Sequence, residues 1–329
     1  MSKHRWKIKW AIFLGFAISG LFLWFALRQT DYESLLDAFA TIRYLPVLAC
    51  ASVMALGMAL RSVRWRIISG RPATDHRHFY RATNLGILSN QLFPGRIGEF
   101  VRIFTLAKLS NSSLPGPLAS ALIDRLIDML VLILSALALY LILPIGEEIE
   151  KWLSGLLITG VVISIVLIVF TKSSGKWEAV LAKITQRWLH RWPLRPESFL
   201  KELREEFRRI SVGWISIELG LLALVIFAID YLTVASLFFA FNLPFSLQAP
   251  LLLWVFLAAG SALPSAPGYI GIYQAAAVLA LSLYAVPAAI AVALATVLQL
   301  TILSVALIMN GPGLFDLLKQ ALASEKATN

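Results

Sequence analysis

Charged residues are scarce in this chain of 329 residues, and their absence from long stretches indicates its class. Lys, Arg, Asp and Glu together make up 15% of the sequence, whereas hydrophobic residues make up 59%. Soluble domains are roughly half apolar and roughly a quarter charged, so this composition argues against an ordinary water-soluble fold. The uncharged runs reach the length that crosses a bilayer, and they predict a polytopic integral membrane protein.

Cysteine and the familiar catalytic motifs are also missing. The one cysteine, Cys50, lies in an apolar stretch, which excludes an internal disulfide and a cysteine-based metal site. No Walker loop, nucleophile motif or zinc motif occurs, so we expect no cofactor and no metal. The net charge of +10 does not indicate nucleic acid as a partner, because the basic residues lie in short loops beside apolar runs, as membrane orientation requires.

Six apolar segments are predicted to be complete transmembrane helices. They are residues 10–27, 45–60, 117–143, 152–170, 214–241 and 287–309. The first follows a basic start, but it is long for a signal peptide and no cleavage site follows it, so we expect a retained anchor. The second is short and requires its flanking side chains to extend to the membrane interfaces.

Two further apolar regions, 79–109 and 251–286, are interrupted near their centres by proline and glycine. The breaks contain Pro94-Gly95 in the first region, and Pro264 and Pro267-Gly268 in the second. Each flanking piece is too short to cross a hydrocarbon core of about 30 Å at about 1.5 Å per residue. Because Pro ends one helix and Gly permits a sharp turn, each region is predicted to be a re-entrant helix hairpin.

The charges of the loops test this layout. With two hairpins, the basic loops 61–81 and 171–213 and both termini lie in the cytoplasm, as the positive-inside rule requires. The loops 28–44, 144–151 and 242–250 then lie outside. If only 251–286 were a full crossing, just the C-terminal tail would change sides, so this hairpin is the less securely assigned of the two. The expected location is a bacterial-type cytoplasmic (inner) membrane, which the chain crosses several times.

The same layout contains an inverted repeat within a single membrane domain, residues 1–329. Residues 45–143 and 214–309 each consist of a span, a hairpin and a span, with opposite orientations. The two breaks share the pattern Pro-Gly-x-Ile-Gly, and such paired interruptions indicate a transport site. The basic loop 171–213 between the repeats is predicted to form surface helices on the anionic inner leaflet.

Three charged residues follow the first break. Arg96 lies at the predicted tip, and Glu99 and Arg102 are spaced to pair on a helix. Exposed N–H groups at Gly95 and Gly98, at the start of the second half-helix, together with an arginine fork, would favour a phosphate headgroup. The alternative is an ion pair that only holds the tip together.

A second set of charges lies within predicted spans. Asp124, Arg125 and Asp128 lie early in 117–143, and Asp230 lies near the middle of 214–241. The first three form either counter-charges and a proton site facing Arg96 and Arg102, or a structural salt bridge. Asp230 is either a proton carrier or the partner of an arginine.

Asp31 and Glu33 follow the first span on the outer side. Membrane glycosyltransferases that use lipid-linked sugars often place paired acids in such a loop. We favour a simpler interpretation, in which Thr30 caps a helix and Glu33 occupies the capping-box position. An embedded glycosyl- or lipid-modifying transferase therefore remains an alternative function, and a non-transporting assembly factor is another.

Three motifs in order carry a family resemblance. They are Asn90 to Arg102 (NQLFPGRIGEFVR), Asp124 to Asp128 (DRLID) and Pro264 to Gly271 (PSAPGYIG). They resemble a flippase-like family related to the transmembrane region of lysylphosphatidylglycerol synthases. The resemblance implies an inner-membrane protein that moves lipids or lipid-linked intermediates between leaflets. Where that family commonly has Glu, this chain has Gln274, and the soluble aminoacyl-transferase domain of the larger synthases is missing.

The sequence therefore predicts an all-α polytopic protein with about six transmembrane helices and two re-entrant hairpins, acting as a lipid flippase-like transporter. Its partners would be membrane lipids with a phosphate-bearing headgroup. The predicted substrate-binding residues are Arg96, Glu99, Arg102, Asp124, Arg125, Asp128 and Asp230. The predicted hairpin tips contain Pro94, Gly95, Gly98, Pro264, Pro267, Gly268, Gly271 and Gln274.

Overall fold

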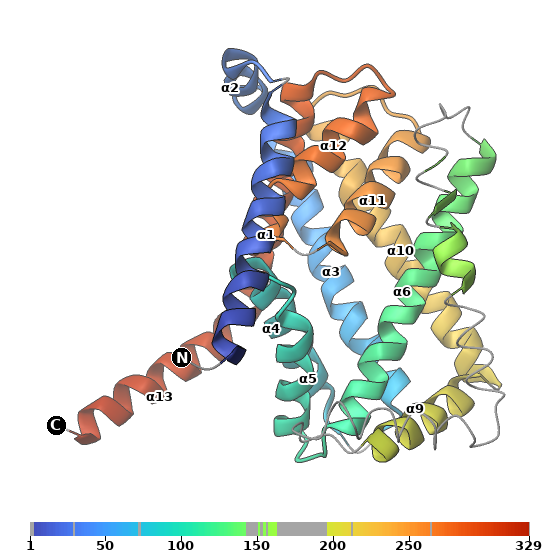
Figure 1. Ribbon diagram of the computed structural model, residues 1–329, viewed down its shortest axis with the longest axis vertical. Coiled ribbons are helices and arrows are strands. Elements are labelled where there is room, and N and C mark those ends of the chain that lie inside the picture. Colours follow the sequence, from blue (N-terminus) through green and yellow to red (C-terminus); the bar gives the residue numbers. More distant parts are fainter. Residues whose placement is uncertain are drawn as a thin grey trace. The chain divides into compact units, whose positions relative to one another are not determined.

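The structure is a computed structural model, and every regular element in its described residues is a helix (Figure 1). It describes residues 3–28, 30–71, 74–142, 151, 154–155, 157–162, 196–211, 213–263 and 265–328. The helices are α1 (Lys3–Leu27), α2 (Tyr32–Ala40), α3 (Tyr44–Ser69), α4 (His76–Leu92), α5 (Gly98–Leu109), α6 (Pro115–Ile142), α9 (Pro196–Ile210), α10 (Trp214–Ala240), α11 (Gln248–Ser261), η1 (Pro267–Tyr269), α12 (Ile272–Ser282) and α13 (Ala288–Thr328).

Among the described residues, four helices are long and apolar enough to cross a membrane. They are α3, α6, α10 and the part of α13 from Ala288 to Gly311, and they coincide with four of the predicted spans. The pair α1 and α2, bent by 89° at the break between them, adds a fifth candidate, from Phe13 to Ala40. The predicted span 152–170 falls for the most part outside the described residues, as do Pro264 and most of 171–213.

The predicted end of the second span, at residue 60, is wrong. The sequence places residues 61–81 in a polar loop, whereas α3 continues to Ser69 and α4 already begins at His76. The extension is held by tertiary contacts, since Trp65 is fully buried and its Nε1 donates a hydrogen bond to Ser120 Oγ on α6 at 3.1 Å. A span that ends in arginines can remain helical when the neighbouring helix accepts their charge.

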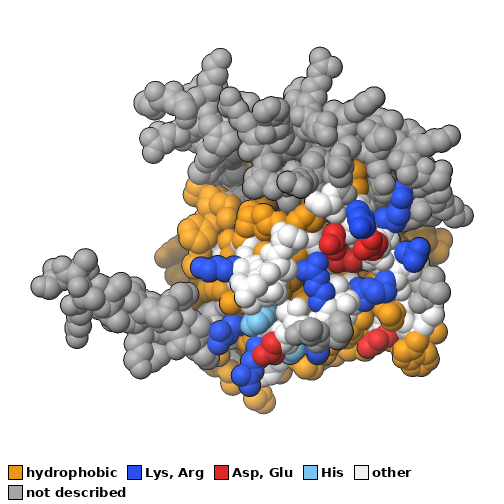
Figure 2. Space-filling view, turned by 90° about the horizontal axis from the view of Figure 1, so that it is seen from below, with side chains coloured by type: hydrophobic (Ala, Val, Ile, Leu, Met, Phe, Trp, Pro, Cys, Tyr) orange, Lys and Arg blue, Asp and Glu red, His pale blue; other side chains and the backbone are white. Residues whose placement is uncertain are grey.

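Large apolar side chains remain exposed along the long helices. Leu221 and Leu224 on α10, and Leu300 and Ile308 on α13, each expose more than half of their surface. A water-soluble protein rarely exposes a continuous surface of this kind, whereas lipid tails solvate it. Figure 2 shows Lys and Arg side chains together with Asp and Glu, beside hydrophobic side chains. The exposed apolar side chains of the long helices support the membrane class.

The chain divides into two compact units, each described here by itself. Unit 1 comprises Met1–Ala59, Tyr80–Arg102 and Ile229–Asn329, and unit 2 comprises Leu60–Phe79 and Ile103–Ala228. In unit 1, α12 packs against α1, α11 and α13. The facing surfaces are rich in fully buried alanines, among them Ala277, Ala280 and Ala291. Small side chains let helices approach closely, which is how helices associate in membranes.

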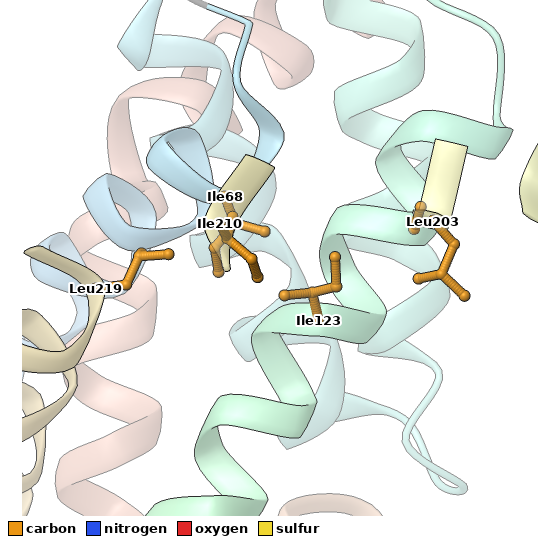
Figure 3. Close-up of a cluster of buried hydrophobic side chains, with 6 residues drawn as sticks. Ile68, Ile123, Leu203, Ile210 and Leu219 are labelled. Atoms are coloured by element: carbon orange, nitrogen blue, oxygen red, sulfur yellow. The ribbon is translucent and has the colours of Figure 1, made fainter. Parts of the chain in front are cut away.

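Unit 2 contains a second apolar cluster, whose buried side chains are drawn in Figure 3, and in it the amphipathic α9 packs on α6. Leu203 and Ile210 of α9 meet residues of α3, α6 and α10, namely Ile68, Ala119, Ile123 and Leu219. α9 lies within 171–213, the segment for which surface helices on the inner leaflet are predicted. Its apolar stripe is buried against the protein, so contact with lipid would have to come from its other faces.

Candidate functional site

The first proline-glycine break separates two helices that fold back on each other. Residues 93–97 are not helical, and α4 and α5 pack side by side. Gly86 on α4 permits this approach, since a Cβ there would lie 2.9 Å from Arg102 Cβ and 2.9 Å from the carbonyl oxygen of Gly98. The break at Pro94-Gly95 thus separates two helices within the predicted region 79–109, and the first of them, α4, starts three residues earlier, at His76.

Arg96 lies at the tip of this hairpin in an unusual conformation. Its φ is 57°, a left-handed value that favours glycine, and the preceding Gly95 has φ 76°. A non-glycine residue held there is strained, and such strain gathers at functional sites. The Arg96 Nε is buried and has no hydrogen-bond partner among the described residues. The tip therefore holds a strained arginine with a buried donor available for a ligand.

Glu99 and Arg102 form the ion pair that their spacing predicts. Arg102 Nε lies 3.1 Å from Glu99 Oε2, and the side chain of Arg102 is 5% exposed against 23% for Glu99. A charge so thoroughly buried requires a partner, and Glu99 supplies one. Glu99 thus balances the charge of Arg102, and the buried Nε of Arg96 has no hydrogen-bond partner among the described residues.

The expectation that backbone N–H groups at the tip are uncovered is wrong. Gly95 N–H donates to the carbonyl oxygen of Ser265 at 3.2 Å, and Gly98 N–H donates to Asn90 Oδ1 at 2.8 Å. The amide group of Asn90 thus caps the start of α5 before any anion arrives. A phosphate at this tip would be held by arginine side chains rather than by these two backbone N–H groups.

The contact with Ser265 joins the two breaks, which both lie in unit 1. The second break contains η1, with Gly268 at φ 64° and Gly271 at φ 86°. It is packed against α1, because Ser19 Oγ accepts a hydrogen bond from Ala266 N–H at 2.8 Å. The second tip is thus seated on α1 as well as on the first tip.

Gln274 organises the second tip. Its Oε1 accepts the Gly271 N–H at 2.8 Å, and its Nε2 donates to Gln299 Oε1 on α13 at 2.7 Å. Gln299 Nε2 in turn donates to the carbonyl oxygen of Gly268 at 2.8 Å. These neutral amides satisfy the backbone that the break sets free, which is what a buried irregular segment requires.

Asp124, Arg125 and Asp128 lie in unit 2 and have a partner that the sequence did not reveal. Arg64 on α3 is 1% exposed and contacts both carboxylates, with its Nη2 2.8 Å from Asp124 Oδ1. It also donates to Asp128 Oδ1, which shares its carboxylate with Arg125 through a 2.9 Å contact at Oδ2. The result is a neutral network of two arginines and two aspartates.

Arg64 is not among the predicted site residues, because the predicted span ends at residue 60 and leaves Arg64 in a loop. The signal that could have revealed it is the pair of apolar residues Trp65 and Ile68 shortly after it, which are both buried and continue the helix. Asp230 lies on α10 in unit 1, partly buried.

The acids of the first outer loop form a helix start. Asp31, rather than the predicted Thr30, is the N-cap of α2, and its carboxylate accepts the Ser34 N–H at 3.0 Å. These hydrogen bonds lower the pKa of Asp31. Glu33 lies in the first turn, where its charge favours the helix dipole, so the structural interpretation accounts for both acids.

Within the described part of the chain, no three His, Cys, Asp or Glu side chains gather closely enough to hold a metal ion. The first tip and the network of unit 2 each combine ionised and hydrogen-bonding side chains. Side chains of these kinds can bind an anion or exchange a proton.

Two comparisons with known proteins find similarity to this chain. Residues 12–309 match the family described as the lysylphosphatidylglycerol synthase TM region. A UPF0104 membrane protein of Methanothermobacter thermautotrophicus is 29% identical over 113 residues. That alignment covers 33% of this chain and 33% of the relative, so the two are comparable over a third of their lengths. No solved structure matches the chain.

Proposed function

Since this chain belongs to the lysylphosphatidylglycerol synthase TM region family, we propose that it is a flippase-like transporter. It moves a phospholipid, or a lipid-linked phosphate, between the leaflets of the cytoplasmic membrane. The headgroup enters between the two hairpins while the acyl chains stay in the bilayer. Both termini face the cytoplasm, and the two repeats, residues 45–143 and 214–309, have opposite orientations in the membrane. The basic residues of 171–213 rest on anionic inner-leaflet lipids.

Arg96 is the observation that carries this proposal. It is strained, it lies at a hairpin tip that touches the second tip, and its buried Nε lacks a partner among the described residues. A planar guanidinium binds phosphate with a pair of hydrogen bonds. Glu99 balances the positive charge of Arg102, and a bound phosphate would compete with Glu99 for Arg102.

Unit 2 carries a charged network of its own. Asp128 shares its carboxylate between Arg64 and Arg125, and Arg125, with 38% of its side chain exposed, is the member of that network that an anion can reach. Asp124 is almost fully buried against Arg64 and holds the network in place. Asp230 is a candidate proton carrier, since a carboxylate within an apolar span is costly unless it functions.

Lipid movement in liposomes tests the proposal. Full-length protein reconstituted with labelled phospholipids or polyprenyl phosphates should exchange label between leaflets faster than protein-free liposomes do. Arg96→Ala should reduce the rate about tenfold or more, because one lost charged hydrogen-bond pair is worth about 1.5–3 kcal/mol. Arg81→Ala, at an exposed arginine on α4, is the matched control and should retain the rate.

Arg96→Gly separates binding from backbone geometry. Glycine adopts the left-handed conformation without strain, so this variant should fold at least as well as the wild type. Transport should still be lost, because the guanidinium is gone. A variant that folds and transports normally would show that Arg96 serves only the turn, and a chemically altered lipid in the same assay would favour the transferase.

A further inference from the structure

Glu206 occupies a place on α9 where an apolar side chain is expected. The buried positions of this helix are Leu200, Leu203, Glu206 and Ile210, which repeat at the three- and four-residue spacing of a single helix face. Leu203 and Ile210 lie in the apolar cluster of unit 2 (Figure 3). Glu206 is 5% exposed, so the same face that docks α9 carries a carboxyl group into the core.

The carboxyl group of Glu206 is not satisfied there. Both of its oxygens are buried, and neither has a hydrogen-bond partner among the described residues. Burial of a carboxylate without a partner is strongly unfavourable, whereas the protonated acid is much less so. The docked state of α9 therefore prefers Glu206 with a proton.

The charged groups nearest to Glu206 are occupied elsewhere. Arg209, one turn along α9, donates to the carbonyl oxygens of Ile67 and Ile68 at the end of α3. Arg71, which follows α3, contacts Glu202 at 3.4 Å. Both arginines favour the ionised form of Glu206 and Glu202 opposes it, but burial is the largest influence and raises the pKa of Glu206 from 4.5 to about 8.

The other two helices that pack on α9 offer no compensating charge. The first charged residue of α6 is Asp124, which is paired with Arg64. The first charged residue of α10 is Glu218, which is exposed and carries the same sign as Glu206. Within the described residues, Glu206 thus depends on a proton for its neutrality.

We infer that Glu206 is a proton-binding site that controls the docking of α9: the helix packs on α3 and α6 while Glu206 is protonated, and it is released as Glu206 ionises. The inference concerns unit 2 alone and stands whether or not the protein transports lipid. The contacts of Arg209 with the end of α3 and of Arg71 with Glu202 remain, so α9 loosens without leaving unit 2.

The direction and range of the pH effect follow from the two protonation states. In the released helix Glu206 has its ordinary pKa of 4.5, and in the docked helix about 8. Below pH 4.5 both forms carry the proton and docking is strongest. Between these values the released form loses its proton first, and the ratio of docked to released helix falls by up to tenfold per pH unit. Above pH 8 the ratio is constant.

Cysteine labelling of the full-length protein measures this ratio. In a Cys50→Ala background, Leu200→Cys places a thiol on the docked face of α9. Lys201→Cys places a thiol at the next position, where the lysine side chain is 76% exposed. The labelling rate at position 200 is divided by the rate at position 201, which cancels the intrinsic pH dependence of the thiol. This divided rate should rise by about a hundredfold between pH 5.5 and 7.5.

Two variants make the result specific. Glu206→Gln is neutral at every pH, so position 200 should stay protected and its divided rate should be flat. Glu202→Gln, which removes a half-exposed neighbour of the same charge, should keep a rise of several tens of fold. The inference is overturned if the wild type shows no rise, if Glu206→Gln retains the rise, or if Glu206→Gln leaves position 200 unprotected throughout.

Discussion

At the scale of single residues, the two arginines around Asp128 differ in what surrounds them. Arg64 is 1% exposed and lies between Asp124 and Asp128, whereas 38% of the Arg125 side chain is exposed. Both make short contacts with carboxylates, but only Arg64 holds a fully buried one. A charge removed from a buried pair leaves its partner without compensation, while an exposed pair is screened by solvent.

Arg64→Ala should therefore destabilise the protein by about 3–5 kcal/mol, and Arg125→Ala by about 0–1 kcal/mol. Unfolding by SDS titration, or the thermal unfolding midpoint in detergent, measures both. The double variant Arg64→Met, Asp124→Leu should regain much of the loss, because it removes the buried charge as well as its partner, and Asp128 keeps Arg125. Equal losses for the two single variants would contradict this account of the network.

At the scale of elements, each hairpin is a pair of helices joined by a turn with left-handed residues. The turns differ in their neighbours. At Gly95, φ is 76° and no atom lies within 4 Å of where a Cβ would stand. At Gly271, φ is 86°, and a Cβ would collide with the Ser19 carbonyl oxygen of α1. The first glycine is thus required by backbone conformation alone, and the second also by packing.

Gly95→Ala should cost about 1–2 kcal/mol, the strain of a left-handed alanine. Gly271→Ala should cost about 2–5 kcal/mol, since overpacking adds about 1–3 kcal/mol to the same strain. The thermal midpoints of the two purified variants give the comparison. If Gly95→Ala proved to be the more damaging, the close seating of the second tip on α1 would be incorrect.

At the scale of the whole molecule, the predicted re-entrant hairpin at 251–286 determines which loops lie on the same side of the membrane. A re-entrant hairpin places residues 247 and 282 on the same side, whereas a full crossing places them on opposite sides. Leu247 and Ser282 are both exposed, and Lys201 on α9 marks the predicted cytoplasmic side.

Single cysteines at these three positions, in a Cys50→Ala background, test the arrangement. A membrane-impermeant maleimide applied from outside should label Leu247→Cys and Ser282→Cys but not Lys201→Cys. Inverted vesicles should give the opposite pattern. Labelling of 247 and 282 from different sides would make α11 to α12 a crossing and would remove the inverted repeat.

The sequence by itself determined the membrane class, the positions of four spans and the two breaks. These follow from local causes: apolar length, and the inability of Pro-Gly segments to continue a helix. It also determined the Glu99 and Arg102 pair, because residues three apart on a helix are neighbours in any context.

Only the tertiary structure decided which charges are compensated and by what. Arg64 meets Asp124 across sixty residues of sequence, and Gly95 meets Ser265 across an even longer separation. Glu206 appears in the sequence as one acid among the many charges of a surface helix, yet packing buries it without a partner. Burial and pairing depend on which helices lie side by side, and a linear pattern does not record that.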